Sequence, residues 1–74
     1  MAELEFIYLS SENGAKIRAA REKAGLSQYE LANLINASAQ QIDQYEKGDY
    51  DIALDRLFEL AGKLNIPVAE LLSD

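Results

Sequence analysis

Two serine-initiated helical patterns, eleven residues apart, constrain the fold of this chain more than any other feature. Ser27 is followed three residues later by Glu30, and Ser38 is followed three residues later by Gln41. Each pair has the spacing of a capping box, in which both side chains satisfy backbone N–H groups at a helix start. Asn36 lies where the first of these helices must end, and asparagine tolerates the left-handed conformation of a tight helical exit. The segment therefore predicts two short helices joined by a sharp turn, a helix-turn-helix.

The size and composition of the chain exclude several kinds of site. With 74 residues, it is close to the lower size at which one apolar core can hold a fold without disulfides or metal. It contains no cysteine and no histidine, so disulfides, thiolate nucleophiles and the usual zinc ligands are excluded. No glycine-rich phosphate motif or enclosed carboxylate pair is recognisable. We therefore expect no enzymatic activity, no cofactor and no metal.

The amino-terminal residues do not indicate export or membrane insertion. The longest apolar run, Phe6 to Leu9, is far too short to span a bilayer. Glu3 and Glu5 precede it, whereas a signal peptide begins with a basic region. We therefore expect a cytoplasmic protein without a membrane partner.

The charge of the chain is unfavourable for a nucleic-acid partner, but it is unevenly distributed. Thirteen acidic and seven basic residues give a net charge of −6, whereas proteins that bind nucleic acids usually carry a basic face. Between Gly14 and Gly48 the charge is +1, and the two flanks together carry −7. Most of the acidic excess therefore lies outside the bihelical segment.

Hydrophobic spacing predicts an all-α domain of five helices, at about 12–24, 28–35, 39–47, 53–64 and 68–72. Alternation at Leu4, Phe6 and Tyr8 weakly indicates a short strand or an extended arm over residues 1–10, preceding the domain at 11–74. Asp49 to Asp51 are expected to form a loop. The apolar positions expected in the core are Ile17, Ala20, Ala24, Leu31, Ala32, Ile35, Ile42, Tyr45, Leu54, Leu57, Leu60, Ala61, Leu64, Val68, Leu71 and Leu72.

The segment GAKIRAAREKAGLSQYELANLINASAQQIDQYEKG, followed by LDRLFELAGKLNIPVAELL, resembles the phage lambda repressor and Cro type of helix-turn-helix, also called the Xre family. The resemblance covers about residues 14–72. Its more specific parts are Gly-Leu-Ser-Gln at 25–28, the pair Leu31-Ala32 and the stretch 42–48 with its Glu-x-Gly ending. It implies a compact five-helix domain that binds operator DNA, commonly as a homodimer, in transcriptional regulation, where such a protein can act as a repressor.

Helical geometry selects the side chains of helix 39–47 that are able to reach DNA. With Ile42 and Tyr45 toward the core, Gln40, Gln44 and Lys47 lie on the opposite face. A helix in the major groove reads base edges from its amino-terminal part. The residues expected to contact bases are Ala39, Gln40, Asp43 and Gln44. Glutamine is also an ordinary solvent-facing helix residue, so the motif is what favours a role in base contact.

A second group of residues is expected to contact the DNA backbone, and it comprises Arg18, Ser27, Gln28, Tyr29, Ser38 and Lys47. Gln28 starts a helix, where backbone N–H groups face an approaching phosphate. The two serines are primarily helix caps, and removing either cap costs roughly 1 kcal/mol. Tyr29 could equally cover neighbouring apolar surface. The resemblance further implies that Arg21 pairs with Glu46 in a structural ion pair.

The acidic stretch Asp49 to Asp51 departs from the family pattern, because related proteins often carry basic or amide residues there. Two carboxylates near phosphates oppose binding, so dimerisation over two half-sites would have to compensate. The dimer contact could use Val68, Leu71 and Leu72 or the segment 4–9, although both segments could instead complete one small core. The alternative function is a protein-interaction module or antitoxin subunit that binds a protein partner through its acidic surface.

Overall fold

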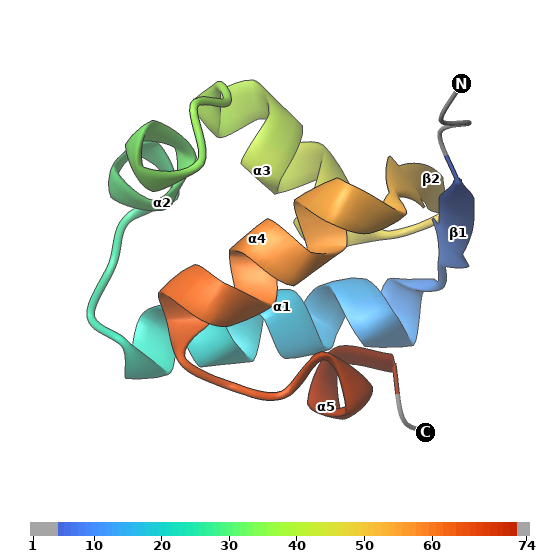
Figure 1. Cartoon of the computed structure of the whole chain (residues 1–74). Coiled ribbons are helices and arrows are strands. Elements are labelled where there is room, and N and C mark those ends of the chain that lie inside the picture. The colour runs from blue at the N-terminus through green and yellow to red at the C-terminus, as the bar shows by residue number, and fades with distance from the viewer. Residues whose placement is uncertain (1–4, 73–74) are drawn as a thin grey trace.

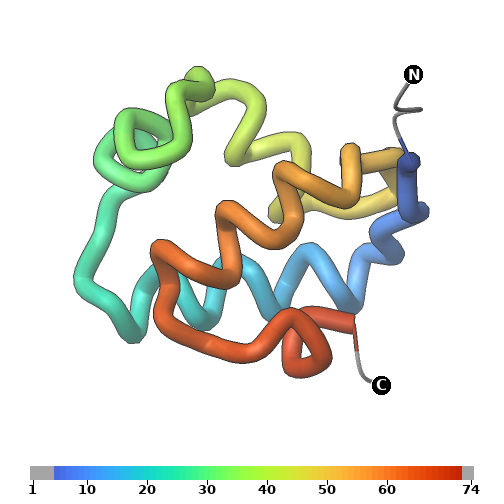
Figure 2. Tube along the Cα trace, viewed as in Figure 1, coloured from blue at the N-terminus to red at the C-terminus, as the bar shows by residue number. Residues whose placement is uncertain are grey.

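The computed structural model describes residues 5–72, which form five helices and a two-stranded sheet. Figure 1 shows α2 and α3 above α1, α4 crossing in front, and α5 below α1. The path of the chain between them can be followed in Figure 2. In chain order the elements are β1 (Phe6–Leu9), α1 (Ser11–Lys23), α2 (Gln28–Leu34), α3 (Ala39–Lys47), β2 (Tyr50–Ala53), α4 (Leu54–Leu64) and α5 (Val68–Leu72).

The first three helices begin at serine caps. Ser10, Ser27 and Ser38 each accept a hydrogen bond from the backbone N–H three residues later, and each cap is a complete capping box. These contacts satisfy N–H groups that have no partner within the helix. Because the caps depend on residues only three apart, the starts of α2 and α3 agree with the sequence prediction.

The turn between α2 and α3 depends on Asn36, which has a φ of 57°. At this left-handed residue the chain leaves α2, and the Ala37 N–H donates back to the Ala32 carbonyl oxygen over 2.8 Å. A backbone bond of this kind satisfies a carbonyl at the end of a helix while reversing the chain sharply. Asparagine adopts this conformation at lower cost than most residues.

The expectation of an all-α fold is confirmed only in part, because residues 6–9 and 50–53 pair as antiparallel strands in an otherwise helical domain. Phe6 lies opposite Ala53, and Leu9 lies opposite Tyr50. Asp49 has a φ of 55° and redirects the chain after α3, so the expected loop becomes the start of β2. The pairing joins segments distant in sequence, which local periodicity cannot reveal. Of the proposed arm at 1–10, Leu4 lies outside the described residues.

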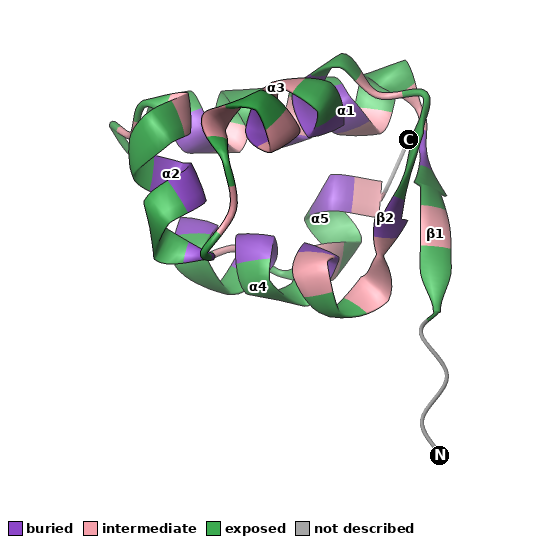
Figure 3. Ribbon diagram, turned by 90° about the horizontal axis from the view of Figure 1, so that it is seen from above, coloured by how far each residue is buried: buried purple, intermediate pink, exposed green. Residues whose placement is uncertain are grey.

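The core is formed by one side of each helix and by the inward side of the sheet, as the buried segments in Figure 3 show. Ile17, Ile42 and Leu57 are fully buried, as expected. Leu9 is also fully buried, and Leu71 is only 1% exposed, so β1 and α5 both contribute to this core. The strand is therefore part of the domain.

Five expected core positions are less buried than predicted, and two of them, Ala20 and Leu54, are partly buried but still pack against the core. Ala24 is exposed because it caps the end of α1, beyond the part of the helix that packs on the core. Val68 and Leu72 are only partly buried at the edge of the core, on the short helix α5. The remaining predicted apolar positions are buried or pack against the core.

Gly14 allows α1 to approach the end of α3 closely. A Cβ atom at this position would lie 2.5 Å from the carbonyl oxygens of both Tyr45 and Glu46. Those atoms belong to the backbone of α3 and cannot rotate away. The spacing between α1 and α3 therefore requires a glycine here.

We expect Gly14→Ala to lower the free energy of unfolding by roughly 1–3 kcal/mol, because the two helices must separate to admit the methyl group. Urea denaturation followed by circular dichroism measures this change. Gly62→Ala is the matched control, since Gly62 lies within α4 and no atom that packs against that helix comes within 4 Å of its Cβ position. That change should instead stabilise the protein by about 0.5–1 kcal/mol. Equal effects at both glycines would contradict the close approach of α1 to α3.

Candidate nucleic-acid interface

The outward side of α3 presents the polar side chains that sequence analysis placed there. Gln40, Gln44 and Lys47 are exposed, while Ile42 and Tyr45 are buried on the opposite side of the helix. Helical periodicity separates the two groups, because residues three or four apart share a face. Within residues 5–72, no element covers the three exposed side chains. The other two predicted base-contacting residues, Ala39 and Asp43, are half-buried at the margins of this face.

A buried ion pair between Arg21 and Glu46 holds α3 against α1. The Arg21 Nε lies 2.5 Å from Glu46 Oε2, and Nη2 lies 3.1 Å from Oε1. The remaining Nη1 donates to the Leu26 carbonyl oxygen over 2.8 Å, which ties the turn before α2 to the same guanidinium. The hydrogen bond with Glu46 raises the pKa of Arg21 although burial opposes the charge. One side chain thereby joins α1, α3 and the chain leading into α2.

Gln28 is engaged in a contact that sequence analysis missed. Its side-chain Nε2 donates to Asp43 Oδ1 over 3.1 Å and to Glu46 Oε1 over 3.0 Å. An amide group has two N–H donors, and here both are directed at carboxylates. Only its oxygen is left to interact, and an oxygen cannot donate to a phosphate. Gln28 therefore links the start of α2 to α3 in this structure, rather than presenting donors to solvent.

Asp43 is the centre of a polar cluster that also contains Lys47, Gln28 and Arg18. Lys47 Nζ lies 2.9 Å from Asp43 Oδ2. This contact, followed by the bond from Gln28 and the positive charge of Arg18, holds the pKa of Asp43 below its usual range. The acidic charge beside Gln40 and Gln44 is thus accompanied by two cations. Its repulsion of phosphates is correspondingly reduced.

The other residues proposed for backbone contact are scattered over the amino-terminal half of the domain. Arg18 is exposed and pairs with Glu22 over 3.3 Å on α1. Tyr29, on α2, is 67% exposed. Ser27 and Ser38 use their hydroxyl oxygens to accept cap hydrogen bonds. The hydroxyl hydrogens of these serines remain available as donors.

One carboxylate of the acidic stretch after α3 is hydrogen-bonded to a residue of β1. The Tyr8 hydroxyl donates to Asp49 Oδ1 over 2.6 Å, and this bond raises the pKa of Tyr8. Asp51 is exposed on β2 opposite Tyr8. The negative charge predicted directly after α3 is therefore present, and one of its carboxylates has a local partner.

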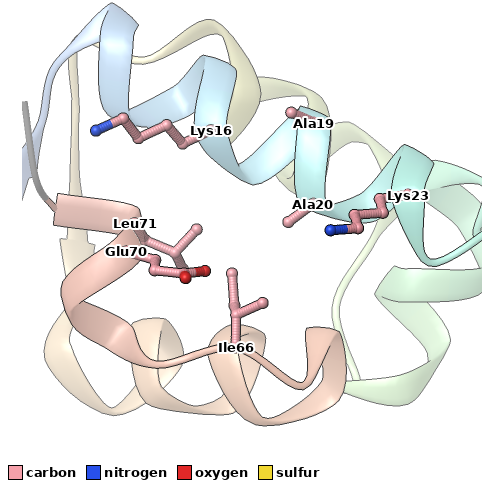
Figure 4. A pocket seen from close by; sticks show the side chains of 7 residues that line it. All are labelled: Lys16, Ala19, Ala20, Lys23, Ile66, Glu70 and Leu71. Carbon is pink, nitrogen blue, oxygen red and sulfur yellow. The ribbon is translucent and has the colours of Figure 1, made fainter.

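A hollow of about 310 Å³ lies between α1 and α5, and Figure 4 shows the side chains of Lys16 and Lys23 on its α1 side. Ala20, Ile66 and Leu71 supply apolar surface. The hollow is separate from the outward face of α3, since α5 and α3 pack on different sides of α1 (Figure 1). Among residues 5–72, no group of three or more acidic side chains is placed to hold a metal ion, and no helix has the length and apolarity required to cross a membrane.

Comparison with known proteins agrees with this architecture. The model of the helix-turn-helix family matches residues 17–71. The cryptic phage CTXphi transcriptional repressor RstR of Vibrio cholerae is 38% identical over 60 residues, covering 81% of this chain and 54% of the repressor. This chain spans 44–62% of the length of the curated relatives that it matches.

Two solved structures have closely similar folds. The restriction-modification controller protein C.AhdI from Aeromonas hydrophila superposes with a TM-score of 0.77 and 31% identity, over 82% of this chain and 92% of the controller. The P22 c2 repressor, solved in complex with a synthetic operator, superposes with a TM-score of 0.75 and 27% identity, over 80% of this chain and 89% of that one. The chain belongs to the lambda-repressor type of helix-turn-helix family.

We expect Arg21→Ala to lower the free energy of unfolding by about 3–5 kcal/mol, because it leaves the Glu46 carboxylate buried without its cation. Chemical denaturation measures the loss. Arg18→Ala is the control, because its ion pair with Glu22 is exposed and should contribute less than about 1 kcal/mol. A small effect of Arg21→Ala would show that the buried pair does not hold α3 in place.

The polar cluster makes a prediction about pH. Because the folded-state pKa of Asp43 is lowered, its contribution to stability is present above the unfolded pKa and is lost as the pH falls through the folded value. Carbon-detected NMR titration of the carboxyl group should show this lower pKa. Lys47→Ala should raise the pKa more than Gln28→Ala does, since Lys47 is the larger cause.

Proposed function

We propose that this domain is a sequence-specific double-stranded DNA-binding transcriptional regulator that inserts α3 into the major groove of an operator. The observation that carries the proposal is the outward face of α3, where Gln40 and Gln44 are exposed. A glutamine amide can donate to N7 and accept from N6 of adenine, which provides direct readout of a base edge. The P22 c2 repressor, which shares this fold, was solved in complex with a synthetic operator, and this supports a DNA-binding role.

Ala39 and Asp43 complete the proposed set of base contacts. The methyl group of Ala39 can contact a thymine methyl, and the Asp43 carboxylate can accept from a cytosine amino group. Asp43 is already bound to Gln28 and Lys47, which orients its carboxylate before DNA arrives. Groups held in advance lose less conformational entropy on binding.

The DNA backbone would lie against the side chains that surround this face. Arg18 and Lys47 supply positive charge, and the hydroxyl groups of Ser27, Tyr29 and Ser38 can donate to phosphate oxygens. Gln28 belongs to this group as a positioning residue, since its own donors hold α2 to α3. Because so few cations surround this face, the affinity for DNA should fall only slightly as the salt concentration increases.

We further propose that the protein acts as a homodimer. Two copies bound to half-sites about 34–36 Å apart would add their contacts and so compensate for weak binding by each copy. Selection from a random duplex library at low and moderate salt, followed by sequencing, tests both proposals. Enrichment of a palindrome supports them, and enrichment of nothing at either salt concentration would overturn the operator proposal.

The acidic charge outside the bihelical unit supports a second candidate, an interaction module or antitoxin subunit for which DNA binding is auxiliary. The net charge is −6, and Asp49 and Asp51 follow α3 directly. This candidate is favoured if the protein forms a stable complex with a protein partner and enriches no duplex from the library. Recovery of a palindrome from the free protein would favour the regulator.

We expect Gln40→Ala and Gln44→Ala to relax preference at particular base pairs by about 1–3 kcal/mol each while leaving the fold unchanged. Binding to a panel of singly substituted operators measures the preference. Gln41→Ala is the matched control on the same helix, because the Gln41 side chain accepts the Ser38 N–H and should affect capping only. Uniform weakening across all operators would instead indicate that Gln40 and Gln44 contact the backbone.

A further inference from the structure

The outer edge of β1 is unpaired. Among residues 5–72 the sheet consists of β1 and β2 alone, and Figure 3 shows β1 on the outside of the domain. The Leu54 N–H donates to the Glu5 carbonyl oxygen over 2.8 Å, which makes Glu5 a hydrogen-bonded position of the antiparallel pair. Because such positions alternate along a strand, the backbone groups of Phe6 and Tyr8 point away from β2. This edge can therefore accept hydrogen bonds from, and donate them to, a further strand.

Large aromatic side chains lie exposed along the same strand. Phe6 is 60% exposed and Tyr8 is 57% exposed. Residues two apart in a strand share a face, so these rings form one apolar surface beside the open edge. A contiguous exposed apolar surface of this kind is typical of interaction sites.

A hollow of about 510 Å³ adjoins this surface and is lined by Tyr8, Asp49, Tyr50 and Asp51. Two aromatic rings and two carboxylates are the chemistry that favours an organic cation, by attraction to the ring faces and by charge-assisted hydrogen bonds. The Tyr8 hydroxyl is bound to Asp49, and the Tyr50 ring packs edge-on against Tyr45 at 5.6 Å between centroids. Both rings are therefore held in position.

The negative charge beside the edge of β1 favours a basic partner. The charged residues within 5–9 and 49–53 are Glu5, Asp49 and Asp51, and all three are acidic. A second copy of this chain would bring the same carboxylates to the contact, and like charges placed together oppose association. A basic segment would meet complementary charge.

We propose that the free edge of β1, together with the hollow lined by Tyr8, Asp49, Tyr50 and Asp51, docks an extended basic segment of a partner protein as a third strand. Main-chain hydrogen bonds to Phe6 and Tyr8 hold the segment, and a lysine or arginine side chain occupies the hollow. This is strand addition, in which the backbone provides affinity and side-chain pockets provide specificity. The site uses none of the exposed residues of α3.

The test is an NMR titration of the nitrogen-15-labelled full chain with an eight-residue peptide that alternates arginine with valine. A peptide with glutamate in place of arginine is the charge control. We expect the arginine peptide to shift the amide signals of Phe6 and Tyr8 and to slow their hydrogen exchange. The glutamate peptide should do neither.

Paired variants test the role of the hollow. Asp49→Asn with Asp51→Asn should weaken binding of the arginine peptide by roughly threefold to tenfold. An asparagine at position 49 retains an acceptor for the Tyr8 hydroxyl and tolerates a positive φ, so the fold should persist. Glu12→Gln with Glu22→Gln, on α1, changes net charge equally and should leave binding unchanged.

Three results would overturn the proposal. Equal binding of both peptides would show that the edge is merely apolar. Shifts confined to the helices would place the contact elsewhere. Concentration-dependent shifts of Phe6 and Tyr8 without peptide would show that the edge belongs to a second copy of the chain.

Discussion

The orientation of α3 depends on the buried pair of Arg21 and Glu46. Neither charge is stable in the core alone, because burial removes the water that solvates it. Together, at 2.5 Å, they neutralise each other and join α1 to α3. The third guanidinium donor reaches Leu26, and Gln28 donates to the same glutamate. Both α2 and α3 are therefore connected to the Arg21–Glu46 pair. This pair fixes the direction in which the outward face of α3 points.

The same arrangement explains why a polar helix face can be both exposed and ordered. Gln28 and Lys47 bind Asp43 from two sides, so the margin of the outward face is held by hydrogen bonds within the domain. Within residues 5–72, no side-chain hydrogen bond constrains Gln40 or Gln44, and both extend from a helix whose other side is buried. The domain thus combines a rigid support with adaptable amide groups, which is what recognition of base edges requires.

The sheet has a different chemistry from the outward face of α3. It completes the core through Leu9 and Ile52, both nearly or fully buried, while Phe6 and Tyr8 stay exposed. Acidic residues accompany this aromatic surface, whereas cations accompany α3. The edge of the sheet is therefore acidic and aromatic, whereas the outward face of α3 is polar and is accompanied by the cations Arg18 and Lys47.

The sequence alone determined the helical starts, the turn and the main buried positions, because these depend on residues within a few positions of one another. Serine caps act over three residues, Asn36 acts on its own backbone, and apolar spacing in α4 repeats within each turn. Only the tertiary structure decided the pairing of β1 with β2 and the engagement of Gln28. Tyr8 and Asp49 are 41 residues apart, and Gln28 and Asp43 are 15 apart. Such contacts form only after packing has brought distant segments together, so no local pattern of residues encodes them.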